Sequence, residues 1–423
     1  MTNKEAAFNI IKKLHESGYE ALLAGGCVRD MLLRRRASDY DIATNAHPDD
    51  VIKLFRRTLK VGARFGVVIV MQQKTKVEVA TFRTETGYVD GRRPGSVKFS
   101  NAKEDAGRRD FTVNGMFYDP IKKEVIDYVN GQGDLKKKIL RTIGNPNERF
   151  SEDYLRMLRA VRFSTQLGFE IEPSTWKAVC GNAEKITKIS GERIAVELET
   201  ILTNPNRARG FSLLVESGLS RSIFPHISSS QALLGIQVLS RLPKKVNFAL
   251  ALACFFCDCN TQVVLDECKI LKLSRNNNKH ISFLLDNRGK LLDENMSLAN
   301  LKKLLAKPNF HDLFEMQKAI QKVSVNSRKS IVPLIKLKRR IKDLGDIELK
   351  PKPLLNGHEL IRLGAVSGPL LGQLTEELYV AQLEGQIKTS EQAVHWAKLW
   401  LKKHKIQEMG FKKRGSTPKK LVT

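Results

Sequence analysis

Residues 25–30 read Gly-Gly-Cys-Val-Arg-Asp, and residues 38–41 read Ser-Asp-Tyr-Asp. The run at 19–24 predicts a short strand before the glycines, residues 28–36 predict a helix, and residues 40–43 predict a second strand. Because side chains two residues apart on a strand point to the same side, Asp39 and Asp41 present two carboxylates to one point. Such a pair suits a hard cation with oxygen ligands, chiefly Mg²⁺.

The glycines add a place for phosphate beside this carboxylate pair. Gly25 and Gly26 let the backbone approach a triphosphate closely, and a helix that starts after them offers N–H groups to it. Arg29 adds a positive charge. Two metal ions about 4 Å apart can activate an attacking hydroxyl and stabilise a leaving pyrophosphate. An Asp-x-Asp pair alone is most often a surface turn, but beside GGCVRD it becomes specific for this chemistry.

Two arginine-rich blocks follow. Residues 108–115 read RRDFTVNG, and two arginines beside an aspartate can clamp a phosphate or a sugar, although a surface salt bridge has the same composition. Residues 152–163 read EDYLRMLRAVRF. Polar positions recur there every three residues, at Asp153, Arg156, Arg159 and Arg162. Steps of three are neighbours on a helix but drift around it, so Arg162 lies well around from Asp153. The ordinary interpretation of such a pattern is an exposed, ion-paired helix face.

Periodicity divides the chain into a mixed α/β part and a helical part. Residues 67–71 and 77–82 predict two strands joined by a hairpin, residues 86–100 predict a mobile loop because they hold three Gly and one Pro, and residues 125–128 predict a last strand. From about residue 151 the pattern turns almost wholly helical. We therefore predict a head over 1–150, a neck over 151–225, a body over 226–345 and a tail with a basic, frayed end over 346–423.

The charge points to a polyanionic partner. The 423 residues include 72 Lys and Arg against 45 Asp and Glu, a formal net charge of +27, and neutralising phosphates releases counterions. No apolar stretch approaches the ~20 residues that span a membrane. The N-terminus carries Glu5 and Glu16 and resembles neither a secretory signal nor a transit peptide. The six cysteines lie in apolar runs, as reduced thiols do, and we expect a cytoplasmic protein with no evident protein partner.

The three blocks together resemble the signature of the class II tRNA nucleotidyltransferase and bacterial poly(A) polymerase family, within the polymerase-β-like superfamily. The resemblance implies an α+β fold: a polymerase-β-like nucleotidyltransferase head, with a mixed sheet and helices, followed by an elongated all-α neck, body and tail. It implies that Asp39 and Asp41 are the catalytic residues and bind two Mg²⁺ ions. It also implies triphosphate contact by Gly26 and Arg29, with Gly25 beside them.

The resemblance assigns the arginine blocks to the incoming nucleotide. It favours Arg109 as a ribose or triphosphate ligand, with Arg108 and Asp110 as neighbours. Asp153 and Arg156 then read the base of CTP or ATP, since a carboxylate accepts from an exocyclic amine and a guanidinium donates to ring acceptors. Nucleotide or phosphate contacts fall to Arg159 and Arg162. Residues 190–194 (SGERI) resemble a helical motif that braces the base-reading helix, and residues 356–360 (NGHEL) resemble the tail of bacterial CCA-adding enzymes.

Several products fit these blocks. The first is CCA added to tRNA, held at its acceptor and elbow by shape and phosphate contacts. A poly(A) polymerase is the alternative, and residues 62–65 (GARF) match its paired basic signature only in part. A CC-adding enzyme would carry a shortened loop at 86–100, which looks intact here, and an A-adding enzyme remains open. A non-catalytic RNA-binding protein is the alternative from another class, and the complete aspartate pair argues against it. We expect neither a zinc site at Cys254, Cys257 and Cys259 nor a phosphohydrolase.

Overall fold

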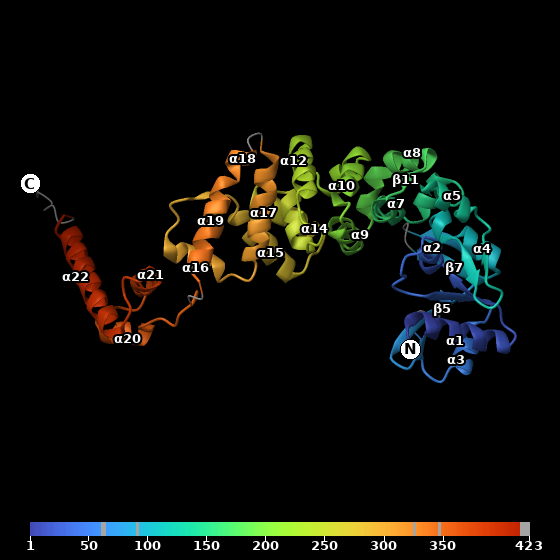
Figure 1. Cartoon of the computed structure of the whole chain (residues 1–423), viewed down its shortest axis with the longest axis horizontal. Helices are drawn as coiled ribbons and strands as arrows, with labels where there is room; N and C mark the ends of the chain where they lie inside the picture. The colour runs from blue at the N-terminus through green and yellow to red at the C-terminus, as the bar shows by residue number, and fades with distance from the viewer. Residues whose placement is uncertain (61–64, 90–92, 325–326, 346–347, 415–423) are drawn as a thin grey trace, which may run out of the picture. The chain divides into compact units, whose positions relative to one another are not determined.

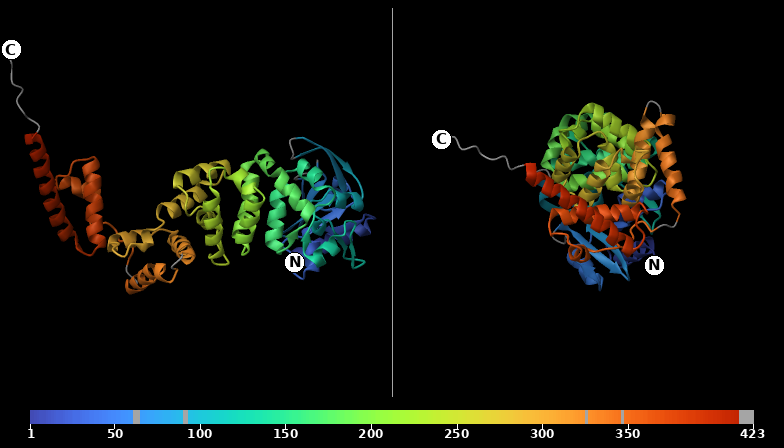
Figure 2. Two further views of the ribbon diagram at one scale, coloured as in Figure 1. Left: turned by 90° about the horizontal axis from the view of Figure 1, so that it is seen from above. Right: turned by 90° about the vertical axis from the view of Figure 1, so that its left-hand side faces the viewer.

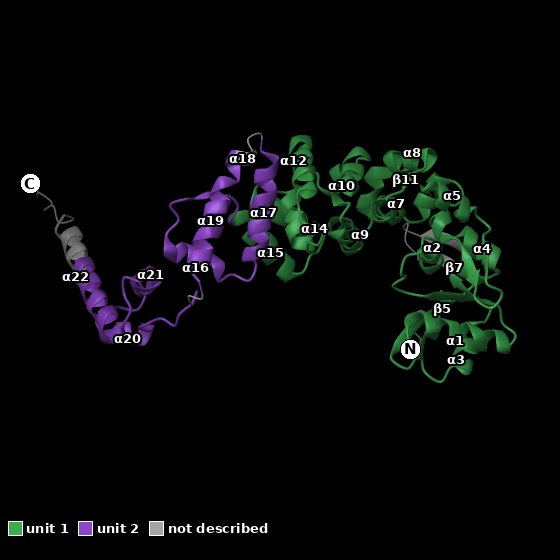
Figure 3. Ribbon diagram, viewed as in Figure 1, with its two compact units in different colours: residues 1–286 green, residues 287–423 purple. Residues whose placement is uncertain are grey.

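The computed structural model describes residues 1–60, 65–89, 93–324, 327–345 and 348–414 (Figure 1). It divides into two compact units, residues 1–286 and residues 287–423 (Figure 3). The partial poly(A) polymerase signature at 62–65 and the end of the basic tail fall largely outside the described residues. Strands are confined to the N-terminal part of unit 1, and helices make up the rest of the described chain (Figures 1 and 2). The predicted mixed head followed by an all-helical chain is therefore confirmed.

A mixed sheet forms the centre of the head. Among the described residues it has seven strands in the order β3-β4-β5-β2-β1-β8-β9. Their bounds are β1 Ala21–Ala24, β2 Asp41–Thr44, β3 Thr58–Leu59, β4 Val67–Gln72, β5 Thr75–Thr81, β8 Phe117–Asp119 and β9 Glu124–Ile126. Strands β2 and β5 pair in parallel, while β1 pairs antiparallel with both β2 and β8. The expected hairpin is β4–β5, which pairs from Val67↔Ala80 to Gln72↔Thr75.

Helices cover the sheet because their apolar positions fall on one side. In Figure 1, α1 (Asn3–Glu16) and α3 (Pro48–Leu54) lie below β5, and α2 (Gly26–Leu32) lies above it. Helix α1 begins with a capping box between Thr2 and Glu5 and buries Ile10 and Leu14, which recur at helical spacing. A second apolar cluster joins the sheet to α4 (Ala102–Gly107) through Leu22, Phe82 and Phe117. This packing fixes the edge at which β1 ends and β2 begins.

The structure of the segment at 86–100 differs from the predicted mobile loop. It forms most of a two-stranded antiparallel sheet of β6 (Arg83–Val89) and β7 (Arg93–Phe99), paired from Arg83↔Phe99 to Val89↔Arg93. The loop prediction was wrong for these strands because it weighed the glycines and the proline, whereas a ladder needs only backbone partners on the facing strand. Residues 90–92, at the tip, lie outside the described residues.

The rest of unit 1 connects the sheet to a helical stack. The elements that close the head are η2 (Thr112–Asn114), α5 (Gly131–Lys137) and a short parallel pair, β10 (Ile139–Leu140) with β11 (Glu170–Ile171). The helices that follow are α6 Pro146–Glu152, α7 Leu155–Leu167, α8 Pro173–Asn182, η3 Ala183–Lys188, α9 Gly191–Thr203, α10 Arg207–Glu216, α11 Leu219–Ile223, α12 Ser229–Ser240, α13 Phe248–Phe255, α14 Thr261–Ile270 and α15 Arg275–Asp286. Helix α7 packs against α9 and α10. Helix α13 is buried along its whole length, and the side chains of Cys254, Cys257 and Cys259 are buried as well.

Unit 2 is helical throughout its described residues. Its elements are η4 Lys290–Leu292, α16 Leu298–Leu305, α17 Phe310–Val323, α18 Ser327–Ser330, α19 Val332–Asp343, α20 Gly357–Arg362, α21 Pro369–Leu383 and α22 Ser390–Arg414. Leu360, Leu374, Leu378 and Trp400 belong to one buried cluster. Helix α22 continues to Arg414, and the fraying expected from residue 402 stays a prediction. The predicted boundaries at 225 and 345 stay predictions. In the described chain, every helix falls short of the length or apolarity needed to cross a membrane.

Candidate active site

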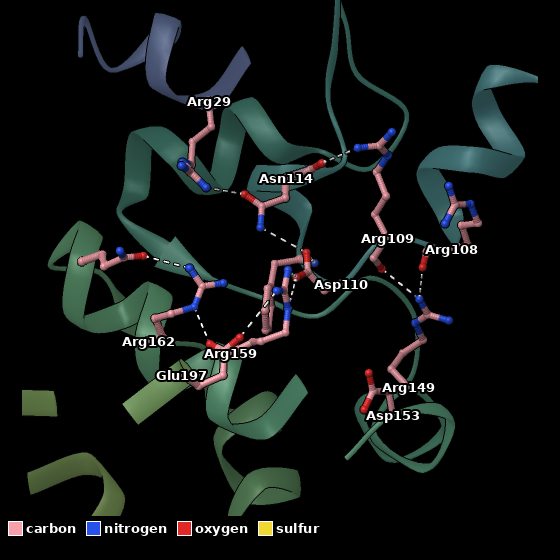
Figure 4. A network of polar contacts seen from close by, with 12 residues as sticks. Arg29, Arg108, Arg109, Asp110, Asn114, Arg149, Asp153, Arg159, Arg162 and Glu197 are labelled. Carbon is pink, nitrogen blue, oxygen red and sulfur yellow. Dashed lines mark hydrogen bonds and ion pairs between the residues drawn. The ribbon is translucent and has the colours of Figure 1, made fainter. Parts of the chain in front are cut away.

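A cavity of about 440 Å³ lies where the head meets α7 and α9. Its lining residues are Gly25, Gly26, Arg29, Asp41, Arg108, Arg109, Asp110, Asn114, Asp153, Leu155, Arg156, Arg159, Phe163 and Arg193. Each of the predicted site residues except Asp39 and Arg162 lines it. The fold therefore brings the three sequence blocks together at one site, and the network around them is drawn in Figure 4.

The glycine turn leaves room for an arginine. Gly25 has φ 73°, a left-handed conformation that favours glycine, and a Cβ built on it would lie 2.9 Å from Nη1 of Arg109. Its N–H donates to the carbonyl of Met116 at 3.1 Å, which ties the turn to the neighbouring strand end. Helix α2 begins directly after it, at Gly26. A larger residue at position 25 would therefore shift the end of the Arg109 side chain.

Arg29 is held in place by amide and carboxylate groups. Its Nη1 donates to Oδ1 of Asn114 at 2.6 Å and its Nε donates to Oδ1 of Asp30 at 2.9 Å. Asn114 in turn donates through Nδ2 to Oδ1 of Asp110 at 3.1 Å (Figure 4). These bonds fix the guanidinium of Arg29 at the end of the cavity that contains the glycine turn.

A carboxylate that the sequence analysis missed anchors the two arginines of the second block. Asp105 is buried in α4 and accepts from Nη2 of Arg108 at 2.7 Å and from Nη2 of Arg109 at 2.9 Å. Burial raises the pKa of Asp105, but the two arginines outweigh it and the pKa lies below its ordinary value. Asp105 is therefore ionised and holds both guanidinium groups at the cavity. Its spacing to the arginines, three and four residues, is the signal that sequence reasoning had available.

The carboxylate of Asp110 accepts hydrogen bonds from several protein donors. It accepts from Arg159 at 2.9 Å (Nε) and 2.5 Å (Nη2), and from the N–H of Phe111 at 2.8 Å. Burial raises the pKa of Asp110, yet Arg159, Asn114 and Phe111 together lower it to about 2. The ionised carboxylate links the head to helix α7, which carries Arg159.

Asp153 and Arg156 lie at the junction of two helices. Asp153 ends α6 with an extended backbone, and its Oδ1 accepts from the N–H of Leu155 at 3.0 Å, at the start of α7. Its Oδ2 accepts from Nη2 of Arg193 at 2.6 Å. Arg156 donates to the carbonyl of Arg149 at 2.7 Å and also to Glu152. The break between α6 and α7 therefore directs both predicted base-reading side chains to the same cavity.

Arg193 is a cavity residue that sequence reasoning placed in a structural motif. It lies at the start of α9 and holds the carboxylate of Asp153. Residues 190–194 were expected to brace the base-reading helix, and the ion pair between Arg193 and Asp153 is a contact of that kind. The residue's place in the cavity wall depends on the packing of α9 against α7, which no local pattern encodes.

Arg162 points to α9 instead of lining the cavity. Its Nε donates to Oε2 of Glu197 at 2.5 Å, its Nη1 donates to Gln166 at 3.1 Å, and its guanidinium lies 3.9 Å from the ring centroid of Phe163 (Figure 4). Arg159 lies between these two environments, since its Nη1 is 3.8 Å from Glu197. The drift expected for steps of three along a helix accounts for this divergence. A nucleotide contact by Arg162 stays a prediction.

The aspartate pair lies at the beginning of β2. Asp41 is the first residue of the strand and lines the cavity, and Asp39 accepts from Oγ of Ser38 at 2.9 Å. Both residues are exposed to solvent. Burial, Glu78 and Asp39 raise the pKa of Asp41 to about 6, and Arg109 partly offsets them. Glu78, on the neighbouring strand β5, was missed by sequence reasoning. Repulsion among these carboxylates is the observation that fits a cation, because a divalent ion at Asp39 and Asp41 would relieve it.

Comparisons with known proteins show which family the chain resembles in sequence and in fold. Residues 21–141 match the model of the poly A polymerase head domain, and residues 168–230 match that of the probable RNA- and SrmB-binding site of polymerase A. The CCA-adding enzyme of Lactobacillus johnsonii is 34% identical over 396 residues, which cover 92% of this chain and 95% of that protein. The crystal structure of the Bacillus stearothermophilus CCA-adding enzyme in complex with CTP aligns with TM-score 0.76 and 28% identity over 97% of this chain and 100% of that one. The Thermotoga maritima CCA-adding enzyme complexed with tRNA has the same fold, with TM-score 0.66 and 21% identity over 94% and 95% of the two chains.

Proposed function

This chain belongs to the class II tRNA nucleotidyltransferase and poly(A) polymerase family, and we propose how its residues add CCA to the 3′ end of tRNA from CTP and ATP. The observation that carries the proposal is the cavity itself. It has the carboxylate of Asp41 beside the glycine turn, and the carboxylate of Asp153 with arginines at the break between α6 and α7. In this proposal the side chains at the second position take the place of a nucleic-acid template.

Asp39 and Asp41 hold the metal ions. Their carboxylates suit Mg²⁺. Burial, followed by the charges of Glu78 and Asp39, raises the pKa of Asp41 to about 6, and a cation would neutralise those charges. Two bound Mg²⁺ ions would activate the tRNA 3′-hydroxyl and stabilise the pyrophosphate that leaves. The chain's own contribution here is to orient the two carboxylates at the start of β2 and to keep Arg109 beside them.

The triphosphate lies along the glycine turn. Gly25 and Gly26 keep the backbone close to it, and Arg29 and Arg109 donate to its oxygens, because each guanidinium has donors left after its protein partner is satisfied. Arg108 is held by the same carboxylate as Arg109 and adds positive charge. Arg159, fixed by Asp110, faces the middle of the cavity and suits contact with the ribose or a phosphate.

The base is read by Asp153 and Arg156. Cytosine and adenine both carry an exocyclic amine, from which the carboxylate of Asp153 accepts, while Arg156 donates to a ring acceptor. Arg193 and the N–H of Leu155 orient Asp153 and leave lone pairs free for the amine. Uracil and guanine present the opposite pattern of donors and acceptors at these positions, so they would leave a buried donor or acceptor unpaired.

The RNA partner is tRNA, which we propose is held at its acceptor and elbow in the cytoplasm. A net charge of +27 supports binding of an RNA backbone. The match of residues 168–230 to an RNA-binding region of polymerase A supports a contact by the helices that follow the head. The helices of unit 2 supply further surface for the elbow.

The test uses three tRNA transcripts that end before CCA, after C and after CC. Each is incubated with Mg²⁺ and CTP, ATP or both, and products are resolved at single-nucleotide length beside an Asp39→Ala/Asp41→Ala control. Completion to CCA on all three, followed by a stop, is the expected result. Long A tracts would identify a poly(A) polymerase, and a stop at CC or use of the CC-ended transcript alone would identify a partial enzyme. An absence of incorporation would favour an RNA-binding protein.

A further inference from the structure

Arg149 makes its contacts behind the cavity wall and not within it. The residue is 9% exposed, lies near the end of α6, and is absent from the cavity lining. Buried arginines are rare unless their donors are satisfied, so the partners of this one carry information. Figure 4 draws it between the second block and the start of helix α7.

The partners of Arg149 belong to both ends of the nucleotide site. Its Nη2 donates to the carbonyl of Arg109 at 2.9 Å and also to the carbonyl of Arg108. Its Nη1 donates to Oε2 of Glu152. One guanidinium therefore holds the backbone of the triphosphate-binding block and a carboxylate of the base-reading segment at the same time.

The same carboxylate continues the connection to the base-reading arginine. Oε2 of Glu152 also accepts from Nη1 of Arg156, and Nη1 of Arg156 donates to the carbonyl of Arg149 at 2.7 Å. Glu152 is 25% exposed at its side chain, whereas Arg156 is only 10% exposed. The path from the backbone of Arg109 to the guanidinium of Arg156 thus runs through short, charge-assisted hydrogen bonds.

We propose that Arg149 is a positioning residue that sets the spacing between Arg156, which reads the base, and Arg109, which binds the triphosphate. Selection of CTP and ATP over UTP and GTP then depends on Arg149, although it touches no part of the nucleotide. The inference rests on the proposed function, because it takes the roles of Arg109 and Arg156 from it.

The physical reason lies in the way a protein reads a base without a template. A correct base is favoured only when its edge meets fixed donors and acceptors while its triphosphate remains anchored. If Arg156 can shift, the site can adapt to the wrong edge and the penalty for UTP or GTP falls. Loss of a charge-assisted hydrogen bond that fixes such a group corresponds to a change of about 10- to 100-fold.

The experiment compares Arg149→Lys with a matched control, Arg207→Lys. Arg207 is 1% exposed and likewise donates to backbone carbonyls, those of Leu202, Pro243 and Lys244 at 2.8, 3.0 and 2.6 Å. It is absent from the cavity lining. Initial rates on a tRNA that ends before CCA are measured over a range of CTP and of UTP, and the melting temperature of each variant is measured in parallel.

The expected result is a CTP-to-UTP ratio of kcat/KM that falls about 10-fold or more in Arg149→Lys and stays unchanged in Arg207→Lys, although both variants lose thermal stability. The KM for CTP should rise more than kcat falls. An unchanged ratio in Arg149→Lys would overturn the inference, since a merely structural arginine would lower the melting temperature alone.

Two further measurements keep the result decisive. If Arg149→Lys fails to fold, Glu152→Gln interrupts the same connection without a change of volume, and an unchanged ratio in that variant refutes the proposal equally. Equilibrium binding of CTP and of UTP to the wild-type chain and the variants, measured by calorimetry, separates this inference from the proposed function. A wild-type chain that binds CTP but adds no nucleotide would contradict the function, whereas an equal CTP-to-UTP affinity ratio in wild type and Arg149→Lys would contradict the inference.

Discussion

Replacement of Asp110 by Asn tests whether a buried ion pair joins the head to the base-reading helix. Asp110 is 10% exposed at its side chain and accepts two hydrogen bonds from Arg159. Asn keeps the shape but removes the charge, so Arg159 loses its nearest ionic partner and keeps only the longer contact with Glu197. The pKa of Asp110 is lowered from 3.8 to about 2, which corresponds to about 2–3 kcal/mol of stabilisation of the folded state near neutral pH.

The sign of the pH dependence follows from that shift. Because the folded-state pKa of Asp110 lies below its unfolded value, its contribution is fully present above the unfolded pKa of 3.8 and is lost as the pH falls through about 2. The difference in unfolding free energy between wild type and Asp110→Asn should therefore be constant from about pH 7 to pH 5 and shrink from about pH 4 downward.

Urea denaturation followed by tryptophan fluorescence measures this difference. The three tryptophans are Trp176 in unit 1 and Trp396 and Trp400 in unit 2, so a Trp396→Phe/Trp400→Phe background restricts the signal to unit 1. Asp266→Asn is the control, since Asp266 contacts Lys269 and Gln262 at the exposed surface and its substitution should change little. A loss in Asp110→Asn no larger than in the control, or one that persists undiminished at acid pH, would refute the reasoning.

Three further perturbations have outcomes fixed by the structure. Gly191→Ala places a Cβ 1.9 Å from the carbonyl oxygen of Ile270 and should lower the free energy of unfolding by about 1–3 kcal/mol. Gly181→Ala adds its Cβ in open space and should raise the free energy of unfolding by about 0.5–1 kcal/mol. Urea denaturation measures both changes, and equal effects would contradict the packing around Gly191. Arg193→Lys replaces the guanidinium fork that holds Asp153 by a single ammonium group. The KM for both CTP and ATP should therefore rise about 10-fold in steady-state kinetics, and an unchanged KM would remove Arg193 from the site. Affinity for tRNA should fall by about 100-fold or more between about 50 and 200 mM salt in filter binding, and a flat response would argue against phosphate contacts.

Local patterns predicted most elements because their signals lie within a few residues. The alternation at 67–82 gave the β4–β5 hairpin, and helical spacing from about residue 151 gave the helices of unit 1. The one clear misassignment, β6–β7, came from treating glycine and proline as evidence of a loop when the facing strand supplied the ladder. The fold then brings the three blocks that the resemblance named to one cavity, although no pattern in the sequence specified the distances between them.

The partners of the site residues were beyond prediction because they are distant in sequence. Arg193 meets Asp153 forty positions away, and Arg149 meets the carbonyl of Arg109 at the same separation. Glu78 approaches Asp41 because β5 and β2 pair in parallel. Such contacts are fixed by packing of whole elements, and a single sequence records only the residue types.

Each cavity arginine is paired with a protein acceptor, and this pairing explains how several guanidinium groups can lie close together in the cavity before a nucleotide binds. Arg109 has Asp105, Arg159 has Asp110 and Arg156 has Glu152, and each of these carboxylates offsets the repulsion between neighbouring guanidinium groups. A guanidinium keeps further N–H donors after one carboxylate is satisfied, and their directions are then fixed. The internal ion pairs thus orient the donors before a nucleotide binds, and a triphosphate and a base edge meet a rigid site. Because the long side chains are already ordered, they add little to the entropic cost of binding. Selectivity in such a site depends on the carboxylates behind the arginines as much as on the arginines themselves.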